Sequence, residues 1–214
     1  MTTTLSPART ATTSDGRTRA LLACGVLAGP VFVLTGLVQG LTRAGFDLTR
    51  HPASLLSDGS LGFIQITNFL VTGLLTLAAA AGISRTLPGR WGPRLLAVYG
   101  VGLLCAGVFR ADPQDGFPLG TPAGPPASVS WHGTLHFVCG GIGFAGLIAA
   151  CFVIGSHLTP GRARYSRITG VLFFLGFAGV ASGSTSPVVT LGFWAAVTVA
   201  WTWLATTSAH LMRR

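Results

Sequence analysis

ALLACGVLAGPVFVLTGLVQGL, residues 20–41, is the stretch that decides the fold. None of its side chains is charged. As an α-helix it would be about 33 Å long, which is enough to cross a hydrocarbon core of about 30 Å. Pro30 lies inside the run, and a membrane helix tolerates such a proline with a bend. We therefore expect this segment to span a membrane.

The composition of the whole chain agrees with a membrane location. Of the 214 residues, 50% are hydrophobic and only 9% are charged, whereas soluble domains carry about 25% charged residues. The apolar runs that could serve as spans are 20–41, 61–83, 93–111, 131–156, 166–183 and 188–208. We predict an all-α integral membrane bundle of six transmembrane helices, with a disordered cytoplasmic tail at 1–19 and a cytoplasmic C-terminus at 211–214.

The charges divide the predicted loops into two sides. Every cation is Arg and every acid is Asp. The two termini and the loops after the second and fourth spans carry eleven arginines and one acid, Asp15. The other side carries Arg43, Arg50, Arg110, Asp47, Asp58, Asp112 and Asp115. By the positive-inside rule both termini are cytoplasmic, in the plasma membrane. The net charge of +9 then reflects topology and anionic lipid rather than nucleic-acid binding.

Polar side chains within the predicted spans gather at the end that carries most of the acids. They are Gln39 in the first span, Gln65, Asn68 and Thr72 in the second, and His132 and His136 in the fourth. In hydrocarbon, such side chains turn toward the bundle interior and pair with one another. We therefore predict one polar pocket that opens to the extracytoplasmic side and is capped by the loops 42–60 and 112–130.

The two histidines of the fourth span carry the sharpest chemical hypothesis. His132 and His136 are four residues apart, so both imidazoles lie on one helical face and could share a metal ion such as zinc. A zinc site needs a third protein ligand, and the candidates are Asp112, Asp115, Asp58 and His51. The alternative is that His136 is a buried hydrogen-bonding residue and His132 lies at the membrane interface.

Other polar residues also have structural explanations. Gln65, Asn68 and Thr72 are better explained by hydrogen bonds between helices than by direct contact with a ligand. Arg110 could snorkel to the interface and pair with Asp112 or Asp115 as a structural clamp. Asp58 precedes a glycine, a pair that is typical of turns.

Two loop regions resemble a known family. The segments FDLTRHPASLLSDGSLGFIQITNF (46–69) and GVFRADPQDGFPLGTP (107–122), the latter followed by SWHGTLHF (130–137), resemble a bacterial six-helix membrane family catalogued as domain of unknown function 998. The resemblance implies the six-span architecture and brings no activity with it. The family-like positions are Asp47, Arg50, His51, Ser54, Asp112, Phe117, Pro118, Gly120, His132 and His136. Asp58 stands where a small Leu-Gly turn is more usual, which argues against a role for it.

Three functions compete. The first is non-enzymatic binding of a membrane lipid or small ligand. Its candidate residues are Asp47, Arg50, His51, Ser54, Gln65, Asn68, Arg110, Asp112, His132 and His136. The second is an intramembrane metal-dependent hydrolase of lipid amides or esters, with His132, His136 and Asp112 as zinc ligands and Asp112 or Asp115 as catalytic residue. A transporter is disfavoured because no span carries a charge at mid-membrane, and six helices would need to form a homo-oligomer. We expect the first function.

Overall fold

The computed structural model describes residues 15–126 and 128–214, and this part of the chain folds into α-helices joined by loops. The elements are α1 (Gly16–Thr42), the short 3-10 helix η1 (Ala53–Ser57), α2 (Gly62–Ser84), α3 (Trp91–Val108), α4 (Trp131–Gly155), α5 (Pro160–Ala181) and α6 (Pro187–Met212). By length and apolar composition α1, α2, α3, α4 and α6 can each cross a membrane. The fifth predicted span, α5, falls outside this group because Arg162, Arg164 and Arg167 lie in its first turns.

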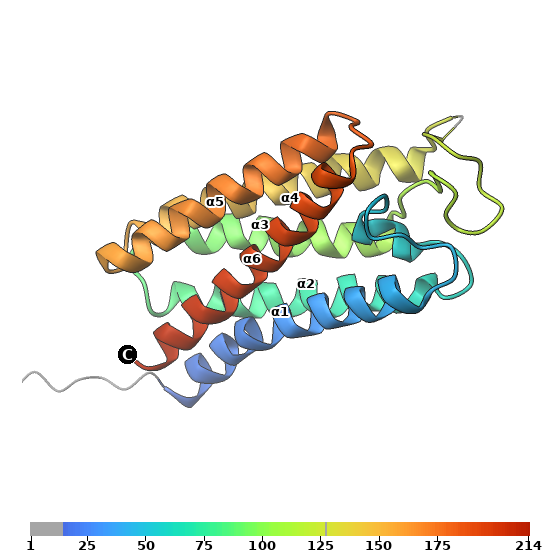
Figure 1. Ribbon diagram of the computed structural model, residues 1–214. Coiled ribbons are helices and arrows are strands. Elements are labelled where there is room, and N and C mark those ends of the chain that lie inside the picture. Colours follow the sequence, from blue (N-terminus) through green and yellow to red (C-terminus); the bar gives the residue numbers. More distant parts are fainter. Residues whose placement is uncertain (1–14, 127) are drawn as a thin grey trace, which may run out of the picture.

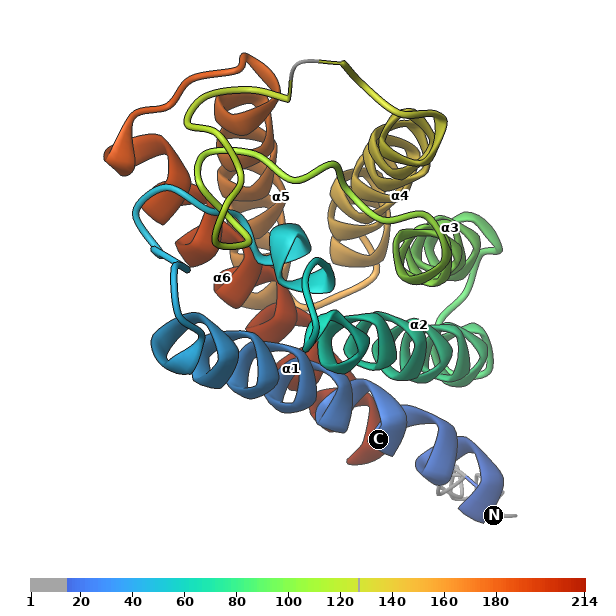
Figure 2. The ribbon, with the colours of Figure 1, turned by 90° about the vertical axis from the view of Figure 1, so that its right-hand side faces the viewer.

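The α-helices form a closed ring (Figures 1 and 2). Each packs against the next one in the chain, and α6 returns to pack against α1. The start of α1 and the C-terminus lie at one end of the bundle, and the connections α1–α2, α3–α4 and α5–α6 lie at the other (Figure 1). We call the end with these three connections the loop end.

The helix ends differ from the predicted ends by up to six residues, the largest shift being at the start of α5. Two of the differences have a cause in local hydrogen bonding. Asp15 caps α1 by accepting a hydrogen bond from the backbone N–H of Thr18 (2.7 Å), so Gly16–Arg19 are helical rather than part of a disordered tail. Residues 1–14 of that tail lie outside the described residues. The predicted span 93–111 ends early, at Val108, because Phe109 turns to extended backbone and its carbonyl accepts a hydrogen bond from His136.

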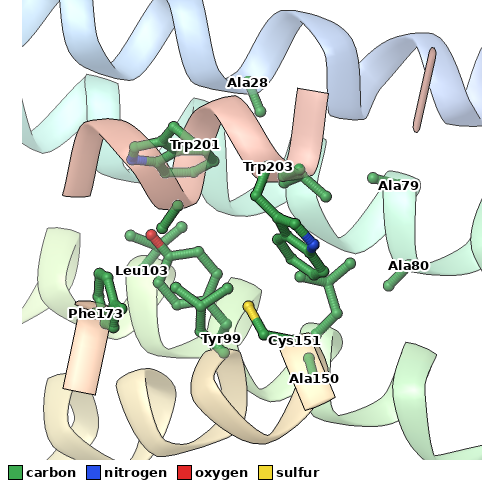
Figure 3. Packing of buried hydrophobic residues seen from close by; sticks show 14 of the residues in the cluster. Ala28, Ala79, Ala80, Tyr99, Leu103, Ala150, Cys151, Phe173, Trp201 and Trp203 are labelled. Carbon is green, nitrogen blue, oxygen red and sulfur yellow. The ribbon is translucent and has the colours of Figure 1, made fainter. Parts of the chain in front are cut away.

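The centre of the bundle is built around α6 (Figure 3). Trp201 and Trp203 are almost fully buried. The indole N–H of Trp203 donates to the hydroxyl of Ser166 (2.7 Å), which donates to the carbonyl of Cys151 (2.7 Å). This chain of hydrogen bonds joins α6, α5 and α4. On the other side, a methyl group on Gly29 would lie 3.0 Å from the Trp201 carbonyl oxygen, so the glycine permits close contact between α1 and α6.

The connections at the loop end have a small core of their own. Phe117, from the α3–α4 connection, is 1% exposed. Its ring packs against the rings of Phe46 and His51, at centroid distances of 5.1 and 5.6 Å, and the Arg43 guanidinium lies 4.9 Å from its centre. Figure 2 shows η1 near the middle of the helix ring, with the α3–α4 connection crossing above it. The two long connections are therefore packed together, which fixes the side chains that they carry.

Candidate ligand-binding site

A pocket lies at the loop end, between the residues that follow η1, the segment after α3 and the start of α4. Its volume is about 240 Å³. It is lined by Asp58, Gly59, Arg110, Ala111, Asp112, Pro113, Ser130 and His132. Three predicted site residues, Arg110, Asp112 and His132, therefore meet in one place, and Asp58 joins them. We call this cavity the loop-end pocket.

Asp58 is the most unusual residue of the loop-end pocket. The residue is 4% exposed, and its Oδ2 atom is buried without a hydrogen-bond partner. Arg43 donates to the backbone carbonyls of Leu56 and Asp58, so its hydrogen bonds go to the main chain and not to the carboxyl. Burial raises the pKa of Asp58 to about 7, although the nearby cations Arg110 and Arg43 oppose this shift. The carboxyl is therefore poised to gain or lose a proton near neutral pH.

Asp112 is held against the first turn of α4. Its Oδ2 accepts a hydrogen bond from the backbone N–H of Ser130 (2.9 Å), and the hydroxyl of Ser130 caps the helix by accepting from the N–H of Gly133 (3.0 Å). A Cβ atom on Gly133 would collide with the Asp112 carboxylate. Only glycine leaves room for this carboxylate, which is favourably placed at a helix N-terminus.

The two histidines of α4 have different surroundings. His132 is half-buried and lines the pocket. Its ring stacks on Trp131 at 3.6 Å between centroids, and its Nδ1 atom has no hydrogen-bond partner. His136 is 8% exposed, and its Nδ1 atom donates to the Phe109 carbonyl, 2.8 Å away. His136 thus connects α4 to the end of α3, as expected if it is a buried hydrogen-bonding residue.

The predicted zinc ligands are not assembled. Among residues 15–126 and 128–214, no group of three His, Cys, Asp or Glu side chains is placed to hold a metal ion. His132 and Asp112 both line the loop-end pocket, whereas His136 does not. The described residues therefore give the zinc-hydrolase hypothesis no ligand set, and Asp115 lies outside the pocket lining as well.

His51 holds the two long connections together. Its Nδ1 accepts from the backbone N–H of Asp47 (2.9 Å), and its Nε2 donates to the Asp115 carbonyl (3.0 Å). The His51 carbonyl in turn accepts from the Trp194 indole (3.0 Å). Both ring nitrogens are thus engaged with backbone, so His51 is a structural residue and is not free to contact a ligand.

The remaining predicted ligand residues of the first loop also lie outside the pocket. Asp47 and Arg50 are exposed and Ser54 is half-buried. Hydrogen bonds from Thr49 to the Asp47 carboxylate hold the pKa of Asp47 below its ordinary value. The carbonyl of Ser54 accepts from the Ser57 hydroxyl (2.7 Å) inside η1. The lining of the loop-end pocket includes none of these residues.

Gln39, Gln65 and Asn68 form a separate group between α1 and α2, which we call the amide cluster. The Gln39 amide donates to the Thr35 carbonyl (3.2 Å) and to Gln65 Oε1 (3.0 Å). The Asn68 amide donates to the Phe32 carbonyl (3.2 Å) and to the same Gln65 oxygen (3.2 Å). Because a backbone carbonyl can only accept, it fixes which way each amide points. The predicted interhelical hydrogen bonds are confirmed for Gln65 and Asn68, but not for Thr72, whose hydroxyl donates within α2 to the Asn68 carbonyl (2.6 Å).

The sequence pattern did not predict that Asp58 would be a buried residue of the pocket. The Asp-Gly pair predicts a turn, and Gly59 does have a positive φ of 74°. The overlooked signal is the preceding pair Leu55-Leu56, which is 1% and 0% exposed. Two large apolar residues, separated from the acid only by Ser57, indicate that the loop enters the bundle, and this entry carries the carboxyl inward.

The helices and their apolar composition define an all-α, multi-pass membrane protein. The chain belongs to a family described as protein of unknown function (DUF998), whose model matches residues 26–210. The family inferred from the loop motifs is thus confirmed. No match was found among curated proteins or among solved structures.

Proposed function

We propose that all six α-helices cross the plasma membrane, with both termini in the cytoplasm and the loop end outside. α5 packs between α4 and α6 and runs along them in Figure 1. The end opposite the loop end carries Arg17, Arg19, Arg85, Arg90, Arg94, Arg162, Arg164, Arg167, Arg213 and Arg214. This asymmetry supports the assignment, because cytoplasmic loops carry an excess of arginine and lysine.

The loop-end pocket binds a small polar ligand or a lipid headgroup without converting it. One observation carries this proposal, namely the buried carboxyl of Asp58, whose Oδ2 has no partner, beside a cavity of about 240 Å³. A buried carboxylate is costly unless it is paired, and a protonated amine would provide the missing partner. Arg110, which is exposed at the same pocket, would bind an anionic group.

The ligand class that fits is therefore a zwitterion with an amine at one end and a phosphate or carboxylate at the other. Ethanolamine phosphate, the headgroup of an aminophospholipid, has this chemistry. The metal-dependent hydrolase is the weaker candidate, because the described residues hold no group of three side chains placed to bind a metal ion, and His136 Nδ1 is bonded to a backbone carbonyl.

Isothermal titration calorimetry with O-phosphorylethanolamine tests this proposal. The protein is held in phosphatidylcholine nanodiscs, whose headgroups carry no primary amine. We expect saturable binding at pH 8 that is about tenfold weaker at pH 6, because an Asp58 carboxyl that titrates near pH 7 is mostly protonated there.

Asp58→Asn is the decisive variant, and Asp47→Asn is its control because Asp47 is exposed and outside the pocket. We expect Asp58→Asn to weaken binding at pH 8 by at least about tenfold and to remove the pH dependence. Equal affinity in Asp58→Asn and in the wild type would refute the proposal.

A further inference from the structure

A second cavity is a groove on the membrane-facing side of the bundle, between α1 and α2. Its volume is about 300 Å³. Phe63 and Val71, which line it, are 62% and 40% exposed, so the groove opens away from the helix ring. Its polar lining comes from Thr35, Thr67 and Asn68. We call it the lateral groove.

The polar residues of the lateral groove lie below the loop end. Thr67 is five residues inside α2 from Gly62, and Thr35 is seven residues inside α1 from Thr42. At 1.5 Å per residue these positions are about 8 and 10 Å below the helix ends. They therefore face the upper part of the acyl chains, where no water is at hand to satisfy polar groups.

Most helical threonines of the bundle donate their hydroxyl to the carbonyl four residues earlier. They are Thr42, Thr72, Thr76, Thr134, Thr169, Thr198, Thr202 and Thr206. Within residues 15–126 and 128–214, Thr35 and Thr67 make no such bond, so both hydroxyls have a free proton to donate. In hydrocarbon, a hydroxyl without a partner is unfavourable.

Asn68 provides an independent indication of a ligand. The residue is 3% exposed and lines the groove. Its amide nitrogen donates to the Phe32 carbonyl, which fixes the side chain, and its Oδ1 atom is buried without a partner. The groove therefore holds two hydroxyl donors from Thr35 and Thr67 and one unsatisfied acceptor, Asn68 Oδ1, which the N–H of an amide-linked lipid would satisfy.

We propose that the lateral groove binds one acyl chain of a membrane lipid through the carbonyl of its ester or amide linkage. The carbonyl oxygen accepts hydrogen bonds from the Thr35 and Thr67 hydroxyls. Val31 and Val71 contact the chain below the linkage, and Phe63 lies above it, nearer the loop end. This site is separate from the loop-end pocket and does not depend on the function proposed for it.

Native mass spectrometry of the delipidated protein in detergent tests the proposal with matched lipids. The probes are dioleoyl phosphatidylcholine and its dialkyl ether analogue, which lacks both carbonyls. An N-acyl analogue then distinguishes an ester from an amide linkage. We expect one ester lipid to bind per chain, about fivefold more tightly than the ether lipid. A difference of this size corresponds to the net free energy of one hydrogen bond. Equal affinity for the ester and the ether would overturn the proposal.

The variant Thr35→Val/Thr67→Val removes both hydroxyls at nearly constant shape, and its control is Thr202→Val/Thr206→Val on exposed positions of α6. We expect the ester-to-ether ratio to fall to about one in the first variant and to persist in the second, as one net hydrogen bond predicts. Val71→Trp, which fills the groove, should lower lipid binding about tenfold, as blocked apolar contact predicts. Unchanged binding in Val71→Trp would also overturn the proposal.

The headgroup is the same on both probes, so the loop-end pocket cannot discriminate between them. Asp58→Asn should therefore keep the ester-to-ether ratio of the wild type. If every protein binds the ester and the ether lipid equally well while O-phosphorylethanolamine still binds, only the groove proposal is refuted. If the ratio holds and O-phosphorylethanolamine does not bind, only the pocket proposal is refuted.

Discussion

The loop-end pocket and the amide cluster are both buried polar groups near the same end of the bundle, and both contain atoms without a hydrogen-bond partner, yet they differ in charge. In the amide cluster, Gln39 and Asn68 donate to Gln65 and to backbone carbonyls, and the atoms left without a partner belong to neutral amides. In the loop-end pocket, Asp58 has a carboxyl oxygen with no partner. Burial of polar atoms alone therefore does not indicate a binding site. An unpaired ionisable group beside an open cavity does.

The largest expected effect concerns the core that supports the loop-end pocket. Phe117→Ala removes a ring that is 1% exposed and packs on Phe46 and His51. We expect a loss of about 3 to 5 kcal/mol in the free energy of unfolding, as for other buried aromatic truncations. Chemical denaturation in detergent measures it. A loss below about 1 kcal/mol would show that the two connections do not depend on this contact.

The pH dependence of stability sharpens the comparison, because the amide cluster cannot titrate. The pKa of Asp58 rises from an ordinary 3.8 to about 7 on folding. A raised folded pKa means that its contribution to stability is complete below pH 3.8 and is lost as the pH rises through 7.

We therefore expect Asp58→Asn to gain stability over the wild type by about 3 kcal/mol between pH 4.5 and pH 8. Paired denaturation curves at the two pH values measure this difference, and other titrating groups cancel between the two proteins. A difference that does not change with pH would show that Asp58 is ionised throughout the range.

Gly133→Ala tests the placement of Asp112 by adding one methyl group. The new Cβ would collide with the Asp112 carboxylate, so we expect a loss of about 1 to 3 kcal/mol and weaker binding of O-phosphorylethanolamine. The matched control is Gly140→Ala in the same helix, where the added Cβ meets nothing within 4 Å. That variant should be neutral or slightly more stable. Equal effects in both variants would contradict the placement of Asp112.

Gln65→Leu disrupts the amide cluster and leaves the loop-end pocket intact. Gln65 accepts two hydrogen bonds, but Gln39 and Asn68 keep their backbone partners. We expect a loss of about 1 kcal/mol, typical of hydrogen bonds between membrane helices. The double variant Gln39→Leu/Gln65→Leu should cost less than the sum of the single ones. Strict additivity would mean that the two amides do not interact.

The smallest effect is expected at Arg50, which is exposed and outside the pocket. Arg50→Ala should change the free energy of unfolding by no more than about 0.5 kcal/mol and leave binding unchanged. Arg110→Ala, its counterpart inside the pocket, should weaken binding of O-phosphorylethanolamine about tenfold through loss of a charge-assisted contact. Calorimetry on both variants would show whether the pocket or the family-like loop motif identifies the ligand residues.

The helices could be predicted because length and apolar composition are local properties of the sequence. Each of the predicted runs overlaps one helix of the structure, with end points shifted by up to six residues. Phe109 departs from the predicted third span because a contact 27 residues away, with His136, draws its carbonyl out of the helix. Local hydrophobicity carries no information about such a contact.

The site could be predicted only in part, for a similar reason. Arg110, Asp112 and His132 were expected to meet, and they do so in the loop-end pocket. His51 looked equally suited to a ligand, but its partners Asp47 and Asp115 come from two different connections. The Asp58-Gly59 pair predicts a turn, but this pattern does not reveal how deeply the turn is buried.

The most direct test of the central claim is one experiment on Asp58→Asn and Gln65→Leu side by side. Both proteins are titrated with O-phosphorylethanolamine at pH 8, and their unfolding is measured in the same nanodiscs. We predict that Asp58→Asn loses binding and stays folded, while Gln65→Leu keeps binding and loses stability. Binding that survives in Asp58→Asn, or fails in Gln65→Leu, would contradict the assignment of ligand binding to the loop-end pocket.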